Sequence, residues 1–197
     1  MKFAAVVLAA GRSTRMQANK LLADLNGRPL LATTIEQIQA SGVDEIVVVT
    51  GHDAAAVATA LSNTKVMIIH NPQYTGGLST SVCCGIGAVK NFDAAFICLG
   101  DMPLIRAADM QRMMQAFNVE QGRKVIIPTY RGQLGNPVLW GQEHFTALMA
   151  LEGDRGARSL LEAQREQITE IAVDHDGILL DADTPEALAD MRKRKDD

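Results

Sequence analysis

Short apolar runs recur along the chain, separated by stretches long enough to form a helix. A brief run rich in Val and Ile is typical of a strand covered on both faces, and a helical pattern follows most of these runs. Strands that alternate with crossover helices pair in parallel and lie between two layers of helices. The sequence therefore predicts an α/β fold, a three-layer α/β/α, Rossmann-like architecture with a mainly parallel sheet. The ligand crevice of such a sheet lies beyond the C-terminal ends of its strands.

The pattern assigns most of the chain to this alternation. The expected strands are Phe3 to Ala10, Glu45 to Thr50, Val66 to His70, Ala94 to Leu99, Val125 to Ile127, Val138 to Trp140 and Ile168 to Val173. The expected helices are Pro29 to Ala40, one capped by Asp53 that ends at Leu61, one that ends at Val89, Ala107 to Phe117, Glu143 to Ala150, Ala157 to Gln164 and Pro185 to Arg194. The segment Pro128 to Pro137 is expected to be a loop or hairpin. No repeat, linker or charge block interrupts the 197 residues, so we expect a single domain over 1–197.

Composition narrows the classes of partner. The net charge of −4 argues against a nucleic-acid surface, since the only basic tract is the short tail Arg192 to Lys195. No apolar run approaches the ~18 residues of a membrane span, and the one after Lys2 is interpreted as the first strand, not a signal peptide. The three cysteines form no metal or disulfide pattern, and free thiols are typical of a reducing compartment. These observations predict a cytoplasmic protein.

The first apolar run ends in a loop that is rich in positive charge. Gly11 opens it, and three cations follow within nine residues, Arg12, Arg15 and Lys20. A buried strand that opens into a Gly-led loop presents backbone N–H groups to an anion, and the cations favour a polyphosphate. The alternative is an ordinary solvated surface loop. Neither a G-x-G-x-x-G nor a G-K-[ST] motif is present, which excludes the two familiar Gly-rich phosphate fingerprints.

A carboxylate stands where another buried strand breaks. Gly100, Asp101, Met102 and Pro103 follow the run AAFICL, so Asp101 is expected to project into the crevice. A carboxylate that faces a triphosphate suits Mg²⁺, which keeps water ligands and takes others from phosphate oxygens. The alternative is that Asp101 caps the helix that follows.

Two more carboxylates, Asp181 and Asp183, precede the last helix in the sequence LLDADTPEAL. Asp183, Thr184, Pro185 and Glu186 form a sound helix start by themselves, with a cap, a proline in the first turn and an acidic residue. This structural reading accounts for much of the motif without any further function.

The segment Gly76 to Ser81 combines glycines with hydroxyl side chains. Glycine permits the close approach of a flat ring, and the hydroxyls of Ser79 and Ser81 can bond a sugar or a base edge. The alternative is that Ser79 or Thr80 merely caps the following helix. Thr50, at the end of the second strand, is expected to line the same pocket. Two further glycine-rich segments, 131–138 and 153–158, carry arginines. The second is a glycine-rich turn into an expected helix with two arginines, which suits an anchor for a phosphate or a pterin. The alternative is a loop followed by an Arg-capped helix.

Several of these segments together resemble one known family. The stretch LAAGRSTRMQANKLL is similar to the LAAGxSxRM…K signature of small nucleotidyltransferases, the family that includes molybdenum cofactor cytidylyltransferases, although Gln17 replaces the usual glycine after Met16. GDMP resembles the family's metal-binding signature, and PTYRGQLGNPVL and GDRGARSLL resemble its molybdopterin-type members. The resemblance extends over nearly the whole chain.

The resemblance implies a fold of the nucleotide-diphospho-sugar transferase type. It implies an enzyme that transfers CMP from CTP to molybdopterin with release of pyrophosphate, uses Mg²⁺, and serves a molybdenum oxidoreductase client. Its catalytic residues would be Arg15, Lys20 and Asp101, and its metal ligands Asp101 and Asp183. The expected nucleotide-binding residues are Leu8, Ala9, Ala10, Gly11, Arg12, Ser13, Arg15, Lys20, Thr50, Gly77, Ser79, Ser81 and Gly100. The expected acceptor-binding residues are Gly135, Asn136, Pro137, Asp154, Arg155 and Gly156.

Two other functions stay open from the sequence. A GTP-specific or sugar-phosphate-specific nucleotidyltransferase of the same fold would share the first half of the chain. Members that transfer GMP tend to carry LAGG, so Ala10 favours cytidine. A non-catalytic protein that delivers a cofactor is the third reading, and the presence of Arg15, Lys20 and Asp101 argues against it.

Overall fold

The structure, a computed structural model, describes residues 1–12, 19–154, 156–161 and 167–194. Its strands are β1 (Phe3–Ala9), β2 (Glu45–Thr50), β3 (Met67–His70), β4 (Ala94–Leu99), β5 (Val125–Tyr130), β6 (Gln133–Leu134), β7 (Val138–Gly141) and β8 (Ile168–Ala172). Its α-helices are α1 (Leu30–Ala40), α2 (Ala54–Ala60), α3 (Leu78–Ala88), α4 (Ala107–Ala116), α5 (Phe145–Met149) and α6 (Pro185–Arg194). Short 3₁₀ turns are η1 (Lys20–Leu22), η2 (Tyr74–Gly76), η3 (Gln142–His144), η4 (Ala157–Leu160) and η6 (Asp176–Leu179).

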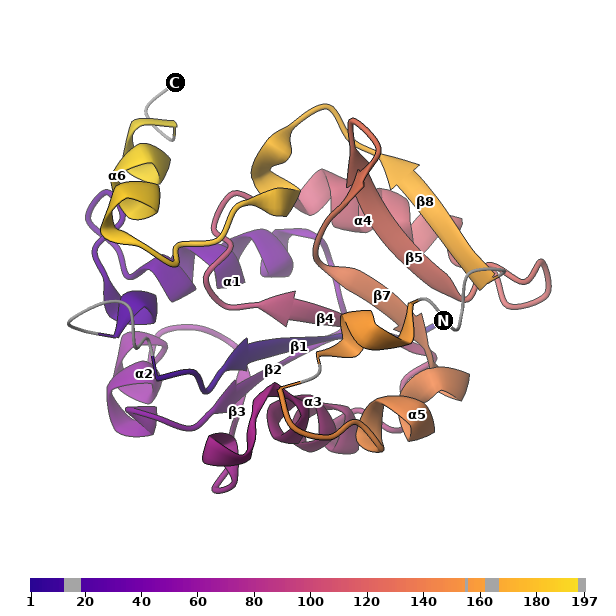
Figure 1. The fold of residues 1–197 in the computed structure, drawn as a ribbon, viewed down its shortest axis with the longest axis horizontal. Coiled ribbons are helices and arrows are strands. Elements are labelled where there is room, and N and C mark those ends of the chain that lie inside the picture. The colour runs from indigo at the N-terminus through magenta and orange to yellow at the C-terminus, as the bar shows by residue number, and fades with distance from the viewer. Residues whose placement is uncertain (13–18, 155, 162–166, 195–197) are drawn as a thin grey trace.

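The strands form one eight-stranded sheet in the order β3-β2-β1-β4-β7-β5-β6, with β8 paired to β5 (Figure 1). β1 lies at the centre of the parallel part, where Val6 is aligned with Val47 on one side and Ile97 on the other. Two strands depart from this direction: β7 pairs antiparallel with both β4 and β5, and the short β6 pairs antiparallel with β5. The predicted α/β fold with a mainly parallel sheet is confirmed.

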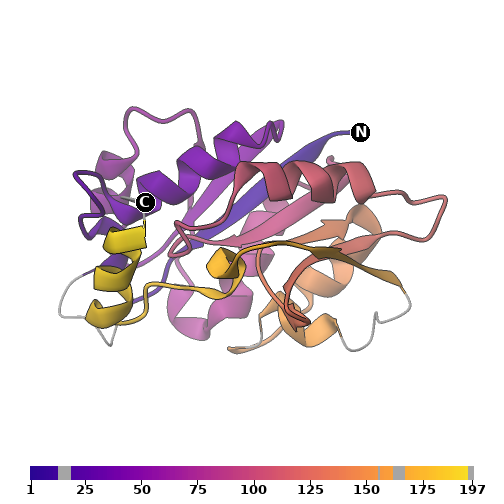
Figure 2. The ribbon, with the colours of Figure 1, turned by 90° about the horizontal axis from the view of Figure 1, so that it is seen from above.

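Helices cover both faces of the sheet, as the view from above shows (Figure 2). Alternate residues of β1 point to opposite faces, so Ala5 and Val7 pack with α1 and α4, whereas Val6 and Leu8 pack with α3 and α5. Both sets are almost completely buried. The unbroken apolar run that predicted this strand is therefore explained by a core on each side of it.

Two local predictions were wrong. The segment expected as an α-helix from Ala157 to Gln164 begins as the 3₁₀ turn η4, and residues 162–166 lie outside the described part of the chain. Asp53 does precede α2, but its backbone is left-handed (φ 54°) and its side chain makes no capping hydrogen bond. Its carboxylate instead accepts a hydrogen bond from Asn19, with a nitrogen–oxygen distance of 3.4 Å.

The C-terminal segment returns across the end of the sheet to α6. Leu188 and Met191 of α6 pack with Leu25, in the loop before α1, and with Leu30, the first residue of α1. The segment before α6 pairs with the loop after β4, since the Ala182 amide donates to the Asp101 carbonyl over 3.0 Å. The end of the chain is thereby fixed beside the C-terminal ends of β1 and β4. No helix in the described part of the chain is both long and apolar enough to cross a membrane.

Candidate functional site

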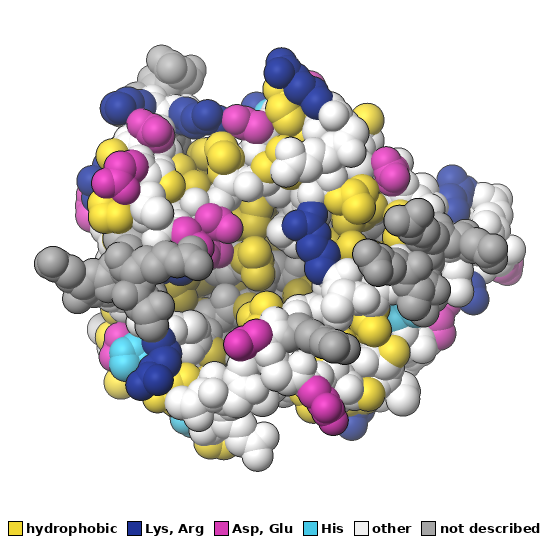
Figure 3. All heavy atoms as spheres, in the orientation of Figure 1, with side chains coloured by type: hydrophobic (Ala, Val, Ile, Leu, Met, Phe, Trp, Pro, Cys, Tyr) yellow, Lys and Arg dark blue, Asp and Glu magenta, His cyan; other side chains and the backbone are white. Residues whose placement is uncertain are grey.

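A cleft of about 630 Å³ opens at the C-terminal ends of β1 and β4. In Figure 3 this face of the molecule is hollowed near its centre, with apolar side chains on the floor and acidic side chains gathered on one side. The lining residues come from six separate stretches: Leu8, Ala10, Gly11, Arg12, Lys20, Leu21, Tyr74, Thr75, Gly77, Leu78, Ser81, Leu99, Asp101, Asp154, Asp181 and Asp183. The crevice therefore lies where a mainly parallel sheet is expected to have it.

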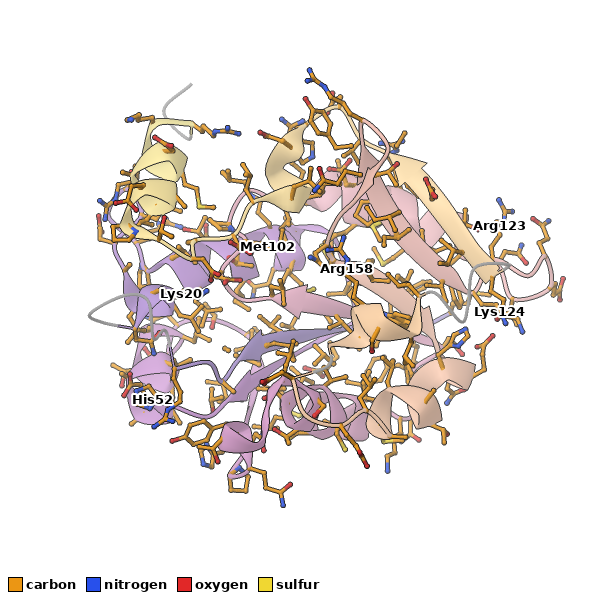
Figure 4. The ribbon with its side chains drawn as sticks, in the orientation of Figure 1. Lys20, His52, Met102, Arg123, Lys124 and Arg158 are labelled. Carbon is orange, nitrogen blue, oxygen red and sulfur yellow. The ribbon has the colours of Figure 1, made fainter. Side chains whose placement is uncertain are left out.

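Three charged side chains meet in this cleft. The Lys20 ammonium donates hydrogen bonds to carboxylate oxygens of both Asp101 and Asp183. The side chains of Lys20 and Asp101 are mostly buried, with 16% and 13% of their surface exposed, and that of Asp183 is 37% exposed. Figure 4 labels Lys20 close to the loop that carries Met102, the neighbour of Asp101. Residues more than 160 positions apart in the sequence thus form one ion-pair network.

The electrostatics of this network favour a charged lysine. Burial of the ammonium acts to lower the pKa of Lys20, since a charged group loses solvation there. The charge and hydrogen bonds of Asp101, and to a smaller degree those of Asp183, outweigh this effect, and the net pKa is raised. The site therefore holds a cation between two carboxylates.

The loop after β4 positions Asp101 through tight packing at Gly100. A Cβ on Gly100 would lie 3.0 Å from both the Leu8 carbonyl and a Leu31 methyl. The Gly100 amide donates to the same Leu8 carbonyl over 3.1 Å, and its carbonyl accepts from the Thr34 hydroxyl. Because α4 begins at Ala107 with Arg106 at its N-cap position, the alternative that Asp101 caps this helix is wrong.

Asp183 also proves not to be a helix cap. The hydroxyl of Thr184 accepts from the amide of Ala187 over 3.2 Å, so Thr184 supplies the capping bond of α6. The Asp183 side chain is turned to Lys20 instead. Asp181 lines the same cleft. The interpretation of this motif as a helix start is right, and the side chain that caps the helix is that of Thr184.

The residues expected to bind the nucleotide fall into two groups. Leu8, Ala10, Gly11, Arg12 and Lys20 line the cleft, as do Gly77 and Ser81 at the start of α3. Ala9, Thr50, Ser79 and Gly100 are not among the lining residues. Ala9 and Thr50 are buried in β1 and β2, and the Thr50 hydroxyl donates to the Ile69 carbonyl. Ser13 and Arg15 lie outside the described residues.

The start of α3 contacts the loop at Gly153. The backbone of Gly77 has φ 103°, and a Cβ there would lie 2.4 Å from the Gly153 backbone. The Ser79 amide donates to the Gly153 carbonyl over 3.1 Å. Neither Ser79 nor Thr80 caps α3, because Gly77 occupies the N-cap position. The close approach of two backbones and the positive φ account for this glycine.

The expected acceptor residues are spread more widely. Asp154 lines the cleft, and Gly156 packs against Leu78, which also lines it. Gly135, Asn136 and Pro137 do not line it. The Asn136 amide donates to the Ile178 carbonyl over 2.9 Å, and a Cβ on Gly135 would lie 2.4 Å from a methyl of the same residue. Arg155 lies outside the described residues.

Arg158, from the same glycine-rich motif, lies across this face of the molecule from Lys20 (Figure 4). Its guanidinium donates to the Leu134 carbonyl in the hairpin of β5 and β6.

Sequence reasoning missed part of the lining. Tyr74 and Thr75 lie in the turn η2 and Leu78 follows it, and none of the three is among the residues expected to bind the nucleotide. Tyr74 packs over Gly51, where an added Cβ would lie 2.5 Å from the Tyr74 Cβ and 2.9 Å from that of Ala10. The signal that could have found this turn is its place directly after a parallel strand, β3, on the edge of the sheet that forms the crevice.

A divalent cation fits this site only with ligands from a substrate. Among the described residues, no group of three or more His, Cys, Asp or Glu side chains is arranged to hold a metal. The pair Asp101 and Asp183 already surrounds one cation, the Lys20 ammonium. Two carboxylates with open space beside them suit Mg²⁺, which completes its shell with water and phosphate oxygens.

The chain matches one family model and is similar to curated proteins. The family model of the MobA-like NTP transferase domain matches residues 5–168. The bifunctional protein GlmU of Syntrophomonas wolfei is 28% identical over 144 residues, which is 72% of this chain and 31% of that protein. The chain thus spans about a third of the length of the curated relatives it matches.

Solved structures agree over nearly the full length. A nucleotidyl transferase from Methanothermobacter, Mth528, has a TM-score of 0.87 and 26% identity, with 98% of this chain and 97% of that chain covered. Rv0371c from Mycobacterium tuberculosis H37Rv, in complex with manganese, has a TM-score of 0.80 and 26% identity, with 98% and 99% covered.

Proposed function

The chain belongs to the family of MobA-like NTP transferase domains, and from that membership we propose that it is a nucleotidyltransferase that transfers CMP from CTP to a molybdopterin-type acceptor. The acceptor's phosphate oxygen attacks the α-phosphorus of the nucleotide, and the bond to pyrophosphate breaks. A phosphate nucleophile is ionised at neutral pH, so the reaction needs no general base. The protein's task is to align the two reactants and to neutralise charge.

The observation that carries this proposal is the ion-pair network of Lys20, Asp101 and Asp183 inside a cleft lined by a Gly-led loop. Lys20 and Arg12 are the cations that the triphosphate would meet there, and the amide of Gly11 stands at the end of β1. This combination of backbone amides, cations and carboxylates is what phosphoryl-group transfer requires. In the proposed enzyme Lys20 exchanges a carboxylate partner for a phosphate when the nucleotide binds.

The proposed metal ligands are Asp101 and Asp183. A divalent ion held there would withdraw negative charge from the phosphates and fix their geometry. Mg²⁺ is the proposed ion, and the manganese complex of Rv0371c, a related chain, supports a divalent cation in this fold. Arg15, which lies outside the described residues, stays a proposed phosphate ligand on the strength of the motif alone.

The choice of cytidine and of a molybdopterin acceptor rests on two motifs. Ala10 lines the cleft, packed near Gly51 and Tyr74, where its methyl group narrows the space open to a base. The glycine-rich segments at 131–138 and 153–158 carry the acceptor side, and of their residues Asp154 reaches the cleft. A molybdenum oxidoreductase would be the client of the product.

A pyrophosphate-release assay tests the proposal. We expect turnover with CTP and molybdopterin in the presence of Mg²⁺, a clear preference for CTP over GTP, and loss of turnover in the presence of a chelator. Asp101→Asn keeps the shape of the side chain but removes its charge, so we expect this variant to fold and to lose turnover. Equal use of CTP and GTP would overturn the cytidylyl assignment and leave the wider one intact. Full activity of the Asp101→Asn variant would remove Asp101 from the metal site.

A further inference from the structure

A buried amide connects two segments that line the cleft. Asn71 directly follows β3 and is 3% exposed. Its side-chain oxygen accepts a hydrogen bond from the backbone amide of Gln73 over 2.9 Å, just before the turn η2. Its side-chain nitrogen lies 2.9 Å from the Thr80 hydroxyl and 3.1 Å from the Ser81 hydroxyl, in the first turns of α3.

The hydrogen bond from the Gln73 amide fixes the orientation of the Asn71 side-chain amide. A backbone N–H can only donate, so the atom that faces Gln73 must be the oxygen of Asn71. The nitrogen of Asn71 then faces the two hydroxyls. Since an amide nitrogen has no acceptor capacity, both Thr80 and Ser81 must accept from it through an oxygen lone pair.

The hydroxyl groups of Thr80 and Ser81 differ in the hydrogen bonds that they donate. The Thr80 hydroxyl donates to the Gly77 carbonyl over 2.8 Å. For Ser81, the residues that the structure describes provide a donor, Asn71, and no oxygen that accepts its proton. Ser81 lines the cleft and is only 3% exposed, whereas Thr80 is not among the lining residues. The proton of Ser81 is the remaining hydrogen-bonding capacity of this cluster.

We propose that Asn71 is a positioning residue that makes the Ser81 hydroxyl a hydrogen-bond donor into the cleft, for an acceptor oxygen of the nucleoside. The candidates for that oxygen are the carbonyl at position 2 of the cytosine and the hydroxyls of the ribose. This inference rests on the proposed nucleotidyltransferase function. It gives the site a preference for a hydrogen-bond acceptor at Ser81, because the same cluster would reject a ligand that presents a donor at this point.

The substitution Asn71→Asp tests whether the Ser81 hydroxyl donates into the cleft, and it hardly changes the shape of the side chain at position 71. The carboxylate still accepts from Gln73, but its second oxygen now accepts the Ser81 proton that the ligand needs. We measure CTP binding by isothermal titration calorimetry in the presence of Mg²⁺. Ser81→Ala should weaken CTP binding roughly 2- to 10-fold, the usual net effect of one hydrogen bond, and Asn71→Asp at least as much. In the double variant Asn71→Asp, Ser81→Ala, the affinity should equal that of Ser81→Ala alone.

Two controls separate this mechanism from a general effect on folding or charge. Thr80→Val removes the other hydroxyl that the amide contacts, and Thr80 is not among the lining residues. We expect it to lower the melting temperature and to leave CTP affinity within about twofold. Equal weakening by Thr80→Val would show that the cluster acts only through helix stability. A loss in Asn71→Asp that persists in the Ser81→Ala background would show that the new charge acts directly on the triphosphate. Either result overturns the inference.

The ligand supplies a second test that does not depend on the folding of an Asn71 variant. 2-Thio-CTP weakens the base acceptor, and 2′-deoxy-CTP and 3′-deoxy-CTP each remove a ribose hydroxyl. One of these analogues should bind the wild-type protein more weakly than CTP and should lose that difference in Ser81→Ala. A wild-type protein that binds CTP with no analogue effect linked to Ser81 overturns this inference alone. A wild-type protein that binds no nucleoside triphosphate overturns the proposed function together with it.

Discussion

At the residue scale, Lys20 is the central residue of the ion-pair network in the cleft. Its ammonium already occupies the space between Asp101 and Asp183, and the raised pKa keeps it charged throughout the neutral range. A divalent ion that enters the same space must displace a tethered cation. In the proposed function a triphosphate would offer Lys20 another partner, so the arrangement would couple metal binding to nucleotide binding.

This argument gives a prediction for Lys20→Ala. With the ammonium removed, the two carboxylates lose the cation that they share, and their mutual repulsion favours another cation in its place. We expect Mn²⁺ to bind the nucleotide-free variant several-fold more tightly than it binds the wild-type protein, while turnover falls sharply because a phosphate ligand is lost. Electron paramagnetic resonance of free Mn²⁺ measures the first effect. The control is Lys65→Ala, which changes the net charge equally. Lys65 lies two residues before β3, at the N-terminal end of that strand. Unchanged Mn²⁺ affinity in Lys20→Ala would contradict the competition.

Some residues of the site could be predicted from the sequence, and others could not. Asp101 was identified because a Gly-Asp-x-Pro break after a buried run has few structural explanations. Asp183 and Thr184 are adjacent and both are good caps, so sequence alone could not separate the residue that caps α6 from the residue that turns to Lys20. Asn71 carried no local signal, because its partners Thr80 and Ser81 are brought to it only by the crossover from β3 to α3.

At the element scale, the segment from β8 to α6 delivers Asp183 to the cleft, and a buried pair anchors its beginning. His175 Nε2 lies 2.6 Å from a carboxylate oxygen of Asp109 in α4, and both side chains are about nine-tenths buried, with 10% and 11% exposed. The Gly177 amide donates to His175 Nδ1 over 3.1 Å, so the ring hydrogen is on Nε2 and donates to Asp109. Both ring nitrogens are thereby satisfied.

We therefore predict that His175→Ala lowers the free energy of unfolding by about 2 kcal/mol, because it leaves the buried Asp109 carboxylate without its main donor. The matched control is Asp174→Ala. Asp174 is the preceding residue and pairs with Arg106, but its side chain is 87% exposed, and exposed pairs contribute little. Urea unfolding followed by circular dichroism measures both variants. Equal stability of the two variants would show that the buried pair does not anchor this segment.

The sheet shows which features of an element can be read from sequence. The runs of β1, β2 and β4 are long and apolar enough to identify central parallel strands. β7 is only four residues long, and the apolar pattern carries no information about strand direction. Its antiparallel insertion between β4 and β5 is decided by the hairpin of β5 and β6 and by the pairing of Ala95 with Trp140.

At the scale of the whole molecule, the cleft joins stretches from residue 8 to residue 183, so a ligand that fills it holds distant parts of the chain together. A ligand that binds the folded state alone stabilises it by about 2.7 kcal/mol when present at 100 times its dissociation constant. For a chain of this size each kcal/mol corresponds to roughly 2–4 °C in melting temperature. Binding in the cleft should therefore be measurable as a thermal shift of about 5–10 °C.

If the proposed function holds, coupling through Lys20 makes this thermal shift non-additive. Mg²⁺ alone must compete with the tethered ammonium, and CTP alone brings a triphosphate close to Asp101 and Asp183 with no ion to offset the repulsion. When both are present, Lys20 can turn to the triphosphate while the metal ion takes the carboxylates. We expect small shifts in melting temperature with either ligand alone and a shift with both that clearly exceeds their sum. Differential scanning fluorimetry over a grid of the two concentrations measures it, and in Asp101→Asn the excess should vanish. Strictly additive shifts in the wild-type protein would mean that the metal and the nucleotide bind at independent sites, and Lys20 would then serve only to hold the two carboxylates together.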